Sequence, residues 1–455
     1  EETEKKFGEY SPEDGWNDYF KKVVDRPQMI LDLAADPDAD VAEFIGRIEQ
    51  NAMAAVSLAT QIQFIQNMFF WAISGAIAVL GAQYWGKKDL TALKKIFGLS
   101  MGQGTLTSLF FWAGCLFCPE VLMKIFAKDA NLIQIGAEYL RWSSWSYILA
   151  GISQNYLAVM KVSDHASRTA WISSVTVIIN IVLNTIFIFG LCGAPAMGVR
   201  GAAFATVLSR AIELVWCMES CHEKSFIPLE IKHIFHWDMR LLKDFWRCGL
   251  PILGSSLVWG IGFTSYTAIL GHLGSDAAAA NSIAAVVRDL ICCACDGLCV
   301  AGSIVVGNEL GAGDLAKGKL YGQRLMYLSY LIGCLSTVLI LASLPPVLWF
   351  VKLTDVAQSY LSGMFIILSI YMIGRCVNTI TINGVFSAGG DTLFDLYSLL
   401  VVMWGLAVPC AFIAAFYLHW NPLVVYTCAC LDEVGKIPWV MYHFHKYKWV
   451  RNLTR

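Results

Sequence analysis

The sequence predicts an all-α membrane protein that crosses the bilayer many times and consists of two similar halves. The first observation is composition, since 57% of the 455 residues are hydrophobic and only 15% are charged, whereas soluble domains carry about a quarter charged residues. The second is a series of long apolar stretches, and the third is an internal repeat. A chain of this length holds on the order of twelve spans of about 20 residues, which leaves little length for a soluble catalytic domain.

From Ala52 onward, stretches long enough for a membrane helix recur along the chain. We count eleven: 52–85, 96–118, 139–160, 171–190, 201–218, 249–270, 277–306, 321–344, 360–385, 396–418 and 422–441. Basic residues orient them, because cytoplasmic loops carry an excess of Lys and Arg. If the connection 87–95 is cytoplasmic, its side holds eighteen basic residues and the other side four. The C-terminus is therefore expected in the cytoplasm.

A shift of 225 residues aligns two parts of the chain without a gap. It places GRIEQNAMAAVSLA (46–59) on GHLGSDAAAANSIA (271–284), and WGKKDL (85–90) on LGAGDL (310–315). Each half repeats after an even number of spans, which predicts a parallel repeat with a pseudo-twofold axis along the membrane normal. The expected segments are an acidic N-terminal segment in place of the first helix, an N-lobe, a cytoplasmic linker, a C-lobe and a basic cytoplasmic tail, at 1–45, 46–218, 219–248, 249–441 and 442–455.

The first fifty residues differ in charge from the rest. They hold 14 acidic and 6 basic residues, whereas the remaining 405 hold 21 acidic and 27 basic. The repeat maps the apolar span 251–271 onto 27–46, which contains five carboxylates, Asp36 and Asp40 among them. Because a central charge costs roughly 2.5–3.5 kcal/mol on the insertion scale, this stretch either supplies cation-binding carboxylates to a wet cavity or is an interfacial or soluble segment.

Ionisable side chains inside a span are candidates for ion coupling, because they are costly there. Asp289 and Asp296 are seven residues apart in the stretch 277–306, near one helical face. Asp296 lies among four cysteines and is a candidate proton carrier, whereas Asp289 is either a second carrier or a local partner of Arg288. The cysteines themselves are expected to be packing residues.

Polar side chains supply further candidates. Asn180 and Asn184 are one turn apart, so their carbonyl oxygens either suit sodium or bond neighbouring helices. A substrate cavity is expected to be lined by polar and aromatic residues, the latter through cation–π contacts: Gln61, Gln66, Asn155, Trp259, Tyr266, Arg375 and Asn378. A shift of 223 pairs Asn155 with Asn378, so both are also candidates for structural bonding. Glu433 and Lys436 are expected to form an ion pair.

Catalysis finds little support in the sequence. The eight histidines lie in connections or tails, and neither HExxH nor GxSxG occurs. We therefore expect no enzymatic activity, no bound metal, and no cofactor apart from a transported sodium ion or proton.

Several stretches together resemble the multidrug and toxic compound extrusion (MATE) family of cation-coupled antiporters. They are NAMAAVSLATQI followed by GAQYWGKKDL, INIVLNTIFIFG with GAPAMGVRGAAFATVLSR, VGNELGAGD, NGVFSAGGDT and DEVGKIPWVMYHFHKYKWVRNLTR, and the resemblance covers about residues 46–455. It implies twelve helices in two six-helix lobes and export of organic cations or other amphipathic drugs in exchange for sodium or protons. Asp40 fits the family's first-helix aspartate with a one-residue shift, whereas 249–270 lacks the glutamate that some members carry.

Two other functions stay open at the level of sequence. One is a lipid-linked sugar flippase of the same superfamily, which needs a more basic cavity, and the other is a non-transporting membrane receptor or scaffold. We expect a monomer in the bacterial cytoplasmic membrane, with a small-molecule substrate and the lipid bilayer as partners and no nucleic acid.

Overall fold

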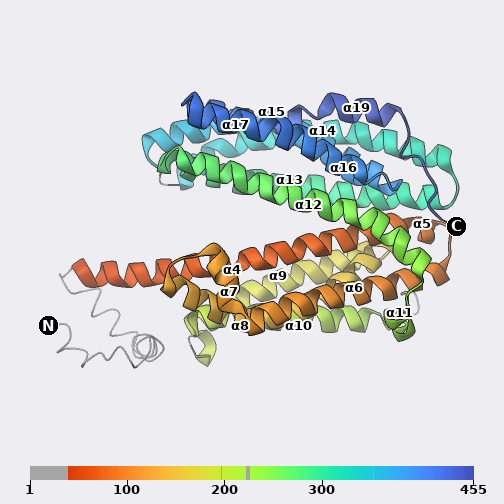
Figure 1. The fold of residues 1–455 in the computed structure, drawn as a ribbon, viewed down its shortest axis with the longest axis horizontal. Coiled ribbons are helices and arrows are strands. Elements are labelled where there is room, and N and C mark those ends of the chain that lie inside the picture. The colour runs from red at the N-terminus through yellow and green to blue at the C-terminus, as the bar shows by residue number, and fades with distance from the viewer. Residues whose placement is uncertain (1–38, 196, 222–225, 352, 455) are drawn as a thin grey trace. The chain divides into compact units, whose positions relative to one another are not determined.

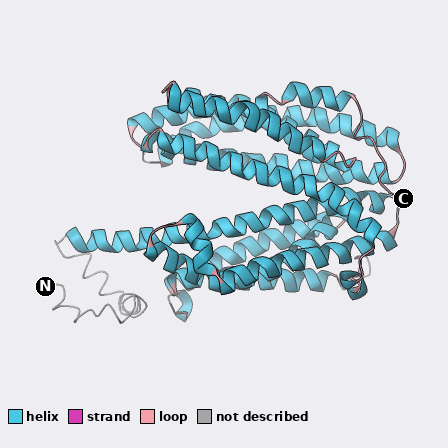
Figure 2. Cartoon of the chain, viewed as in Figure 1, coloured by secondary structure: helices cyan, strands magenta, loops and turns pink. Residues whose placement is uncertain are grey.

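The structure, a computed structural model, describes residues 39–195, 197–221, 226–351 and 353–454. Within these ranges the chain is helical and contains no strand, as Figure 2 shows. The expected all-α fold is confirmed, and each expected apolar stretch falls largely within one helix or within consecutive helical segments. The cysteines, expected as packing residues, are all free.

The helices of the first half follow one another with short connections (Figure 1). They are α4 (Ala39–Ala76), continued by η1 (Ile77–Gly81) and α5 (Ala82–Gly86), then α6 (Leu90–Phe117), α7 (Pro119–Phe126), α8 (Ala130–Val162), α9 (Ala166–Phe189), η2 (Leu191–Gly193) and α10 (Gly198–Ser220). A bend of 90° separates α6 from α7. It lies at Cys118, whose backbone is not helical, and Pro119 then begins a new helix because proline is favoured in a first turn.

The second half begins with the short α11 (Ile231–Phe235) and continues with longer helices. They are α12 (Met239–His272), α13 (Ser275–Gly311), α14 (Leu315–Phe350), α15 (Asp355–Asn378) with η3 (Thr379–Phe386), α16 (Leu393–Ser398) with η4 (Leu399–Ala407), α17 (Val408–Phe412) and η5 (Ile413–Tyr417), and finally α18 (Pro422–Val434) and α19 (Ile437–His445). The segments η3, η4 and η5 are π-helical. Such segments are rare and often occur at functional sites.

Short polar side chains fix where the helices of the second half begin. Asp238, Asp314, Thr354 and Asn421 each accept a hydrogen bond from a backbone N–H in the first turn of the helix that follows. These bonds satisfy N–H groups that have no partner inside the helix. The caps therefore set the register of α12, α14, α15 and α18, and with it the faces that these helices bury.

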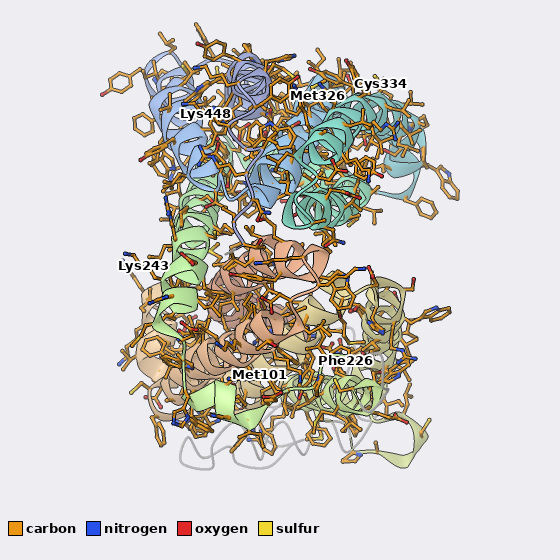
Figure 3. The ribbon with its side chains drawn as sticks, turned by 90° about the vertical axis from the view of Figure 1, so that its right-hand side faces the viewer. Met101, Phe226, Lys243, Met326, Cys334 and Lys448 are labelled. Atoms are coloured by element: carbon orange, nitrogen blue, oxygen red, sulfur yellow. The ribbon has the colours of Figure 1, made fainter. Side chains whose placement is uncertain are left out.

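Eight helical segments of the described chain are long and apolar enough to cross a membrane, and a ninth is added if α6 and α7 count as one span. Large apolar side chains are exposed on them, for example Trp171 at 70%. Because lipid tails cover such surfaces, exposure of apolar side chains is expected on a membrane helix. Figure 3 shows side chains along α14, where Met326 is buried and Cys334 is exposed.

The core of the second half is centred on α15. Leu361, Phe365 and Leu368 follow one another at helical spacing on one face and are completely buried, in one cluster with Val425 and Tyr426 of α18. The same face of α15 continues toward its C-terminal end. This packing positions the polar residues described next.

The described chain divides into two compact units. One comprises the residues up to Gln66 together with Ser108–Ala150 and Trp171–Trp216, and the other comprises Asn67–Thr107, Gly151–Ala170 and the chain from Cys217 onward. Several helices of the first half run from one unit into the other. All contacts described below lie within one unit or the other, and the lobe boundaries expected from the repeat remain predictions.

Candidate functional site

Helix α12 presents three aromatic side chains on one face. Trp259, Phe263 and Tyr266 are spaced by four and three residues, so they lie above one another on the helix. The rings of Trp259 and Phe263 stack with their centroids 5.6 Å apart. An aromatic wall of this kind binds apolar or cationic groups.

Helix α13 places an ion pair opposite this wall. Nε and Nη2 of Arg288 each lie 2.9 Å from Oδ1 of Asp289, and the guanidinium carbon lies 5.2 Å from the centre of the Phe263 ring. Asp289 is 64% exposed, whereas Arg288 is only 15% exposed. Asp289 therefore pairs with Arg288, and the guanidinium also covers an aromatic face.

A second group of charges lies between α15 and the end of α18. Nη1 of Arg375 donates to Oε1 of Glu433 at 3.0 Å, and Nδ2 of Asn378 donates to Oε2 of Glu433 at 2.8 Å and to its backbone carbonyl at 2.7 Å. Nζ of Lys436 lies 3.9 Å from Oε2, which confirms the expected ion pair. Glu433 and Lys436 are each 3% exposed. Burial makes such a cluster sensitive to the loss of any one member.

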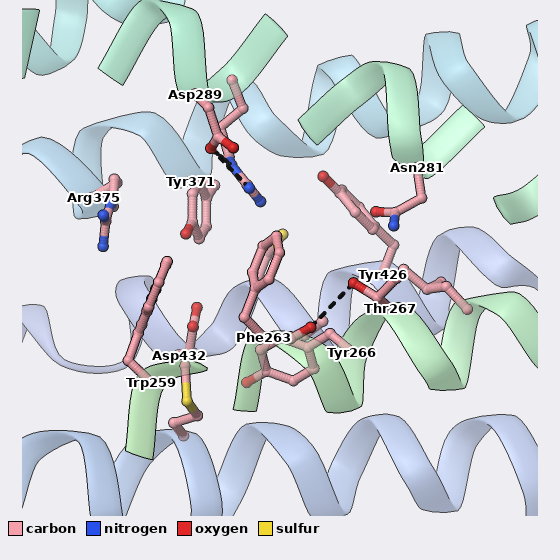
Figure 4. A pocket seen from close by; sticks show the side chains of 15 residues that line it. Trp259, Phe263, Tyr266, Thr267, Asn281, Asp289, Tyr371, Arg375, Tyr426 and Asp432 are labelled. Carbon is pink, nitrogen blue, oxygen red and sulfur yellow. Dashed lines mark hydrogen bonds and ion pairs between the residues drawn. The ribbon is translucent and has the colours of Figure 1, made fainter. Parts of the chain in front are cut away.

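These helices enclose a cavity of about 60 Å³, shown in Figure 4. Its lining includes the aromatic residues of α12, the Arg288–Asp289 pair, Tyr371 and Arg375 of α15, Met403 of η4, and Tyr426 and Asp432 of α18. The volume admits a few water molecules or one small group. The cavity therefore combines aromatic surfaces with two basic and two acidic side chains.

Two polar atoms of the lining are buried without a hydrogen-bond partner. They are Oδ1 of Asp432 and the hydroxyl oxygen of Tyr266, and Asp432 is only 4% exposed. Buried polar atoms are nearly always bonded to protein or to water. An acceptor and a donor that both lack partners at one cavity indicate a place for a ligand, an ion or water.

The structure brings some of the predicted residues together at this cavity. Trp259, Tyr266, Arg375 and Asp289 line it, and Asn378 bonds Glu433 directly beside it. Asp296 lies two turns along α13, is exposed, and forms no hydrogen bond or ion pair with the part of the chain that the structure describes. Its role as a proton carrier remains a prediction.

The predicted residues of the first half lie elsewhere. Nδ2 of Asn184 donates to Oδ1 of Asn180 at 3.0 Å, and Nδ2 of Asn180 donates to the hydroxyl of Ser209 on α10, also at 3.0 Å. Asn155 is buried on α8 and donates to the carbonyl of Gly151 in its own helix at 2.6 Å. Asn184, Asn180 and Ser209 thus form a neutral chain of hydrogen bonds, to which Asn155 does not belong.

Four further predicted residues belong to the beginning of the described chain or precede it. Gln61 is exposed on α4, whereas Gln66 is buried and donates to the carbonyl of Tyr147 at 3.4 Å. Asp36 lies outside the described residues, and of Asp40 only the helical backbone is described. Their predicted roles are therefore neither supported nor opposed.

Sequence reasoning missed Asp432, Phe263 and Tyr426. A signal for Asp432 was present, because Asp432 and Glu433 are adjacent acids in an apolar stretch, and an acid inside a span is a candidate by default. The spacing of Glu433 and Lys436 predicts their ion pair but gives no indication of the role of Asp432. Phe263 lies one turn after Trp259, which the sequence did single out.

Curated proteins that resemble this chain are transporters by name. An uncharacterized transporter of Bacillus subtilis strain 168, YisQ, is 22% identical over 392 residues, covering 86% of this chain and 85% of its own. A probable multidrug resistance protein NorM of Thermotoga maritima is 25% identical over 429 residues, covering 92% of this chain and 90% of its own. The similarity extends over nearly the whole chain in both cases.

Solved structures share the fold. An outward-facing multidrug resistance MATE family transporter has a TM-score of 0.78 at 18% identity, covering 88% of this chain and 89% of its own. The Vibrio cholerae MATE transporter VcmN in its bent form has a TM-score of 0.78 at 16% identity, covering 89% of this chain and 90% of its own. Likeness at this level supports a twelve-helix, two-lobe fold. The model of the MatE family matches residues 41–186 and 251–413, so the chain belongs to the MatE family of membrane transporters.

Proposed function

We propose that the chain is a secondary active efflux antiporter, which exports organic cations or other amphipathic drugs in exchange for sodium ions or protons. Membership of the family supports transport, and the names of several relatives refer to multidrug resistance. The cavity of the second half supports a cationic group as one of the ligands.

The observation that carries this proposal is the unpartnered carboxylate oxygen of Asp432 in an aromatic cavity. Arg288 is paired with Asp289, and Arg375 is paired with Glu433. The negative charge of Asp432 therefore has no direct counter-ion among the described residues. Aromatic rings add attraction for a cation through their faces.

The size of the cavity limits what it holds. Drug-sized ligands occupy pockets of about 300–1,000 Å³, whereas this cavity has about 60 Å³. It therefore takes a coupling ion or the cationic end of a larger molecule. Trp259 and Phe263 supply the apolar surface for the rest of such a ligand.

Exchange follows from competition for one carboxylate. When a proton or a sodium ion neutralises Asp432, the attraction for a cationic substrate at that position is lost. When the ion leaves, the carboxylate again binds the substrate, so that the two occupy the site in turn. Glu433 stays compensated throughout by Arg375 and Lys436, and Asn180 and Asn184 remain a second candidate site for sodium.

The remaining expectations form part of the same proposal. The transporter acts as a monomer in the bacterial cytoplasmic membrane, with its C-terminus in the cytoplasm. It needs no cofactor other than the transported ion, catalyses no chemical reaction, and binds no nucleic acid.

Ethidium efflux from cells that express the chain tests the proposal. The sodium and proton gradients are collapsed separately, and we expect efflux to stop when one of them is lost. The gradient whose collapse stops efflux identifies the coupling ion. Efflux that persists without either gradient, or a well-expressed chain that moves no ethidium or other organic cation, contradicts the proposal.

Asp432→Asn tests the assignment of the carboxylate. We expect gradient-driven efflux to fall by at least about tenfold, because removing one member of a buried charge interaction costs 2–5 kcal/mol or more. Asp355→Asn is the matched control, since Asp355 is exposed in the first turn of α15. If Asp296→Asn abolishes efflux and Asp432→Asn does not, antiport stands and the carboxylate is wrongly assigned.

A further inference from the structure

Gln83 on α5 is completely buried, and both ends of its side-chain amide are bonded to backbone from the end of the chain. Nε2 donates to the carbonyl of Ala388 at 2.7 Å and to that of Arg451 at 3.2 Å, and Oε1 accepts from the N–H of Leu453 at 2.6 Å. Figure 1 shows α5 beside the C-terminus. One side chain of the first half thus holds two segments that lie more than 300 residues away in sequence.

The helix that carries Gln83 crosses the end of α13 at very close range. A Cβ atom on Gly86 would overlap the backbone carbonyl of Asn308, and a Cβ atom on Gly311 would overlap that of Gln83. The 225-residue shift relates Gln83 to Asn308 and Gly86 to Gly311. Each partner therefore supplies one glycine and one carbonyl, as a twofold axis through the crossing requires.

The two related amides differ in what they bind. Gln83 makes three hydrogen bonds, whereas Oδ1 of Asn308 is buried without a partner. The C-terminal tail also contacts the other side of the crossing, because Nδ2 of Asn452 donates to the carbonyl of Gly311 at 3.4 Å. Residues 451–453 thus touch both helices at the point where they cross.

The tail is firmly seated just before it reaches Gln83. Trp449 is completely buried and stacks on Phe444 with ring centroids 5.6 Å apart. A Cβ atom on Gly389 would overlap the carbonyl of Trp449, and one on Gly322 would overlap its ring. The glycines leave room for the tail. The buried Trp449 anchors it there, so that residues 451–453 are positioned beside Gln83.

We propose that Gln83 and residues 451–453 form a latch that keeps α5 and the end of α13 together, and that substrate loading requires this latch to open. The inference rests on the proposed function, because only a transporter that alternates between the two membrane faces needs these helices to separate. Separation at the crossing pulls Gln83 away from the tail and breaks its three hydrogen bonds together. Gln83 does not line the cavity at Asp432, so it is a positioning residue, which acts through its hydrogen bonds to the tail and not through contact with a ligand.

Hydrogen exchange on the full-length transporter tests the latch without reference to flux. In Gln83→Leu, we expect the backbone amides of 305–312 to exchange at least tenfold faster than in the wild type, along with those of 449–454. A second variant that ends at Val450 keeps Gln83 and removes two of its three bonds, and it is expected to accelerate exchange in 305–312 as well. Gln358→Leu is the control, because the side chain of Gln358 makes a single hydrogen bond, to the carbonyl of Leu353 in the connection just before its own helix.

Transport kinetics give the second readout. If opening of the latch limits loading, both variants raise the maximal rate of ethidium efflux by about two- to tenfold and leave KM unchanged. A residue that only supports folding would instead lower the maximal rate in proportion to the folded amount.

Two results overturn the inference. One is exchange in 305–312 that stays as in the wild type in both variants, even if the tail residues that each variant retains exchange faster, and the other is a maximal rate per folded transporter that is unchanged or lower in both. If the wild type moves no organic cation at all, the proposed function fails, and exchange in 305–312 alone decides whether the latch exists.

Discussion

Helices α10 and α18 occupy corresponding places in the two halves, yet they carry different chemistry. The 223-residue shift that pairs Asn155 with Asn378 also places Ser209 on Asp432, Arg210 on Glu433 and Glu213 on Lys436. Arg210 and Glu213 of α10 form an ion pair at i and i+3, as do Glu433 near the end of α18 and Lys436 just after it, with the charges reversed between the halves. The repeat has therefore preserved where polar groups lie and not which charges they carry.

The two corresponding asparagines, Asn155 and Asn378, likewise keep their position but differ in what they bind. Asn155 and Asn378 are both buried, and Oδ1 of each lacks a partner. Asn155 donates within its own helix, whereas Asn378 donates across to Glu433. Of these two asparagines, Asn378 alone ties two helices together, and it does so at a charged cluster that adjoins the aromatic cavity.

The largest expected effect comes from breaking the charged cluster. Glu433→Gln leaves Arg375 and Lys436 without their carboxylate, and removing one partner of a buried pair destabilises by about 3–5 kcal/mol. Arg210→Gln, its counterpart in the first half, is expected to cost about 1–3 kcal/mol, because Arg210 is partly exposed. Unfolding of the purified protein in detergent measures both. Equal losses would show that the halves do not differ in this way.

A smaller effect is expected at the aromatic wall. Trp259→Ala removes the ring that stacks on Phe263, and loss of a cation–π contact of about 0.5–2 kcal/mol raises the KM for ethidium roughly twofold to thirtyfold. Trp171→Ala in the first half is the control, since its ring is 70% exposed. An unchanged KM in Trp259→Ala would remove this wall from the substrate site.

The sequence predicts the helices well because each apolar stretch is long and nearly free of charge. It predicts the cavity only in part. The spacing of Trp259 and Tyr266 shows that they share one face of a helix, but it does not show which other helix packs against that face. The sequence shows Asp432 as an acid inside an apolar stretch, but its place at the cavity depends on how α12, α13, α15 and α18 pack together. The cysteines around Asp296 make it a candidate in the sequence, yet nothing in the described chain pairs with it.

The neutral amides of the first half are expected to respond more weakly still. Ser209→Ala deprives Nδ2 of Asn180 of its acceptor, which costs about 1 kcal/mol in stability. We also expect this substitution to leave proton-driven efflux intact. The proposed ion-binding carboxylate is Asp432 of the second half, and Ser209, at the corresponding position of the first half, carries no carboxylate. Efflux at varied sodium concentration provides the measurement, and a loss of sodium dependence would instead assign the coupling site to Asn180 and Asn184.

The smallest effect concerns how each half holds the segment that follows it. Lys94 donates to Glu230 at 2.9 Å, and its repeat counterpart Lys319 lies 3.7 Å from the centre of the Tyr447 ring. The hydrogen bond and the charge of Lys94, together with His233, hold the pKa of Glu230 below its ordinary value. Stabilisation by this pair is therefore present above the unfolded pKa of about 4.3 and is lost as pH falls through the lower folded value.

Melting temperatures at several pH values check this difference. Lys94→Gln is expected to melt slightly below the wild type at pH 7, and the gap closes below about pH 4 as Glu230 is protonated. The gap for Lys319→Gln is expected to stay the same over this range, because its cation–π contact with the Tyr447 ring involves no carboxylate. A gap for Lys94→Gln that persists in acid would show that Lys94 acts through something other than Glu230.

The crossing of Gly86 and Gly311 also bears on how a chain of this kind arises. A contact in which each side supplies both the small residue and the carbonyl is self-complementary, so two copies of a half-length ancestor could form it with each other. In such a symmetric pair, any substitution would act on the contact twice. In the single chain the two amides differ, because Gln83 bonds the tail whereas Oδ1 of Asn308 is buried without a partner. A chain that contains both halves can thus have, at one end of the molecule, an asymmetry that a symmetric dimer cannot have.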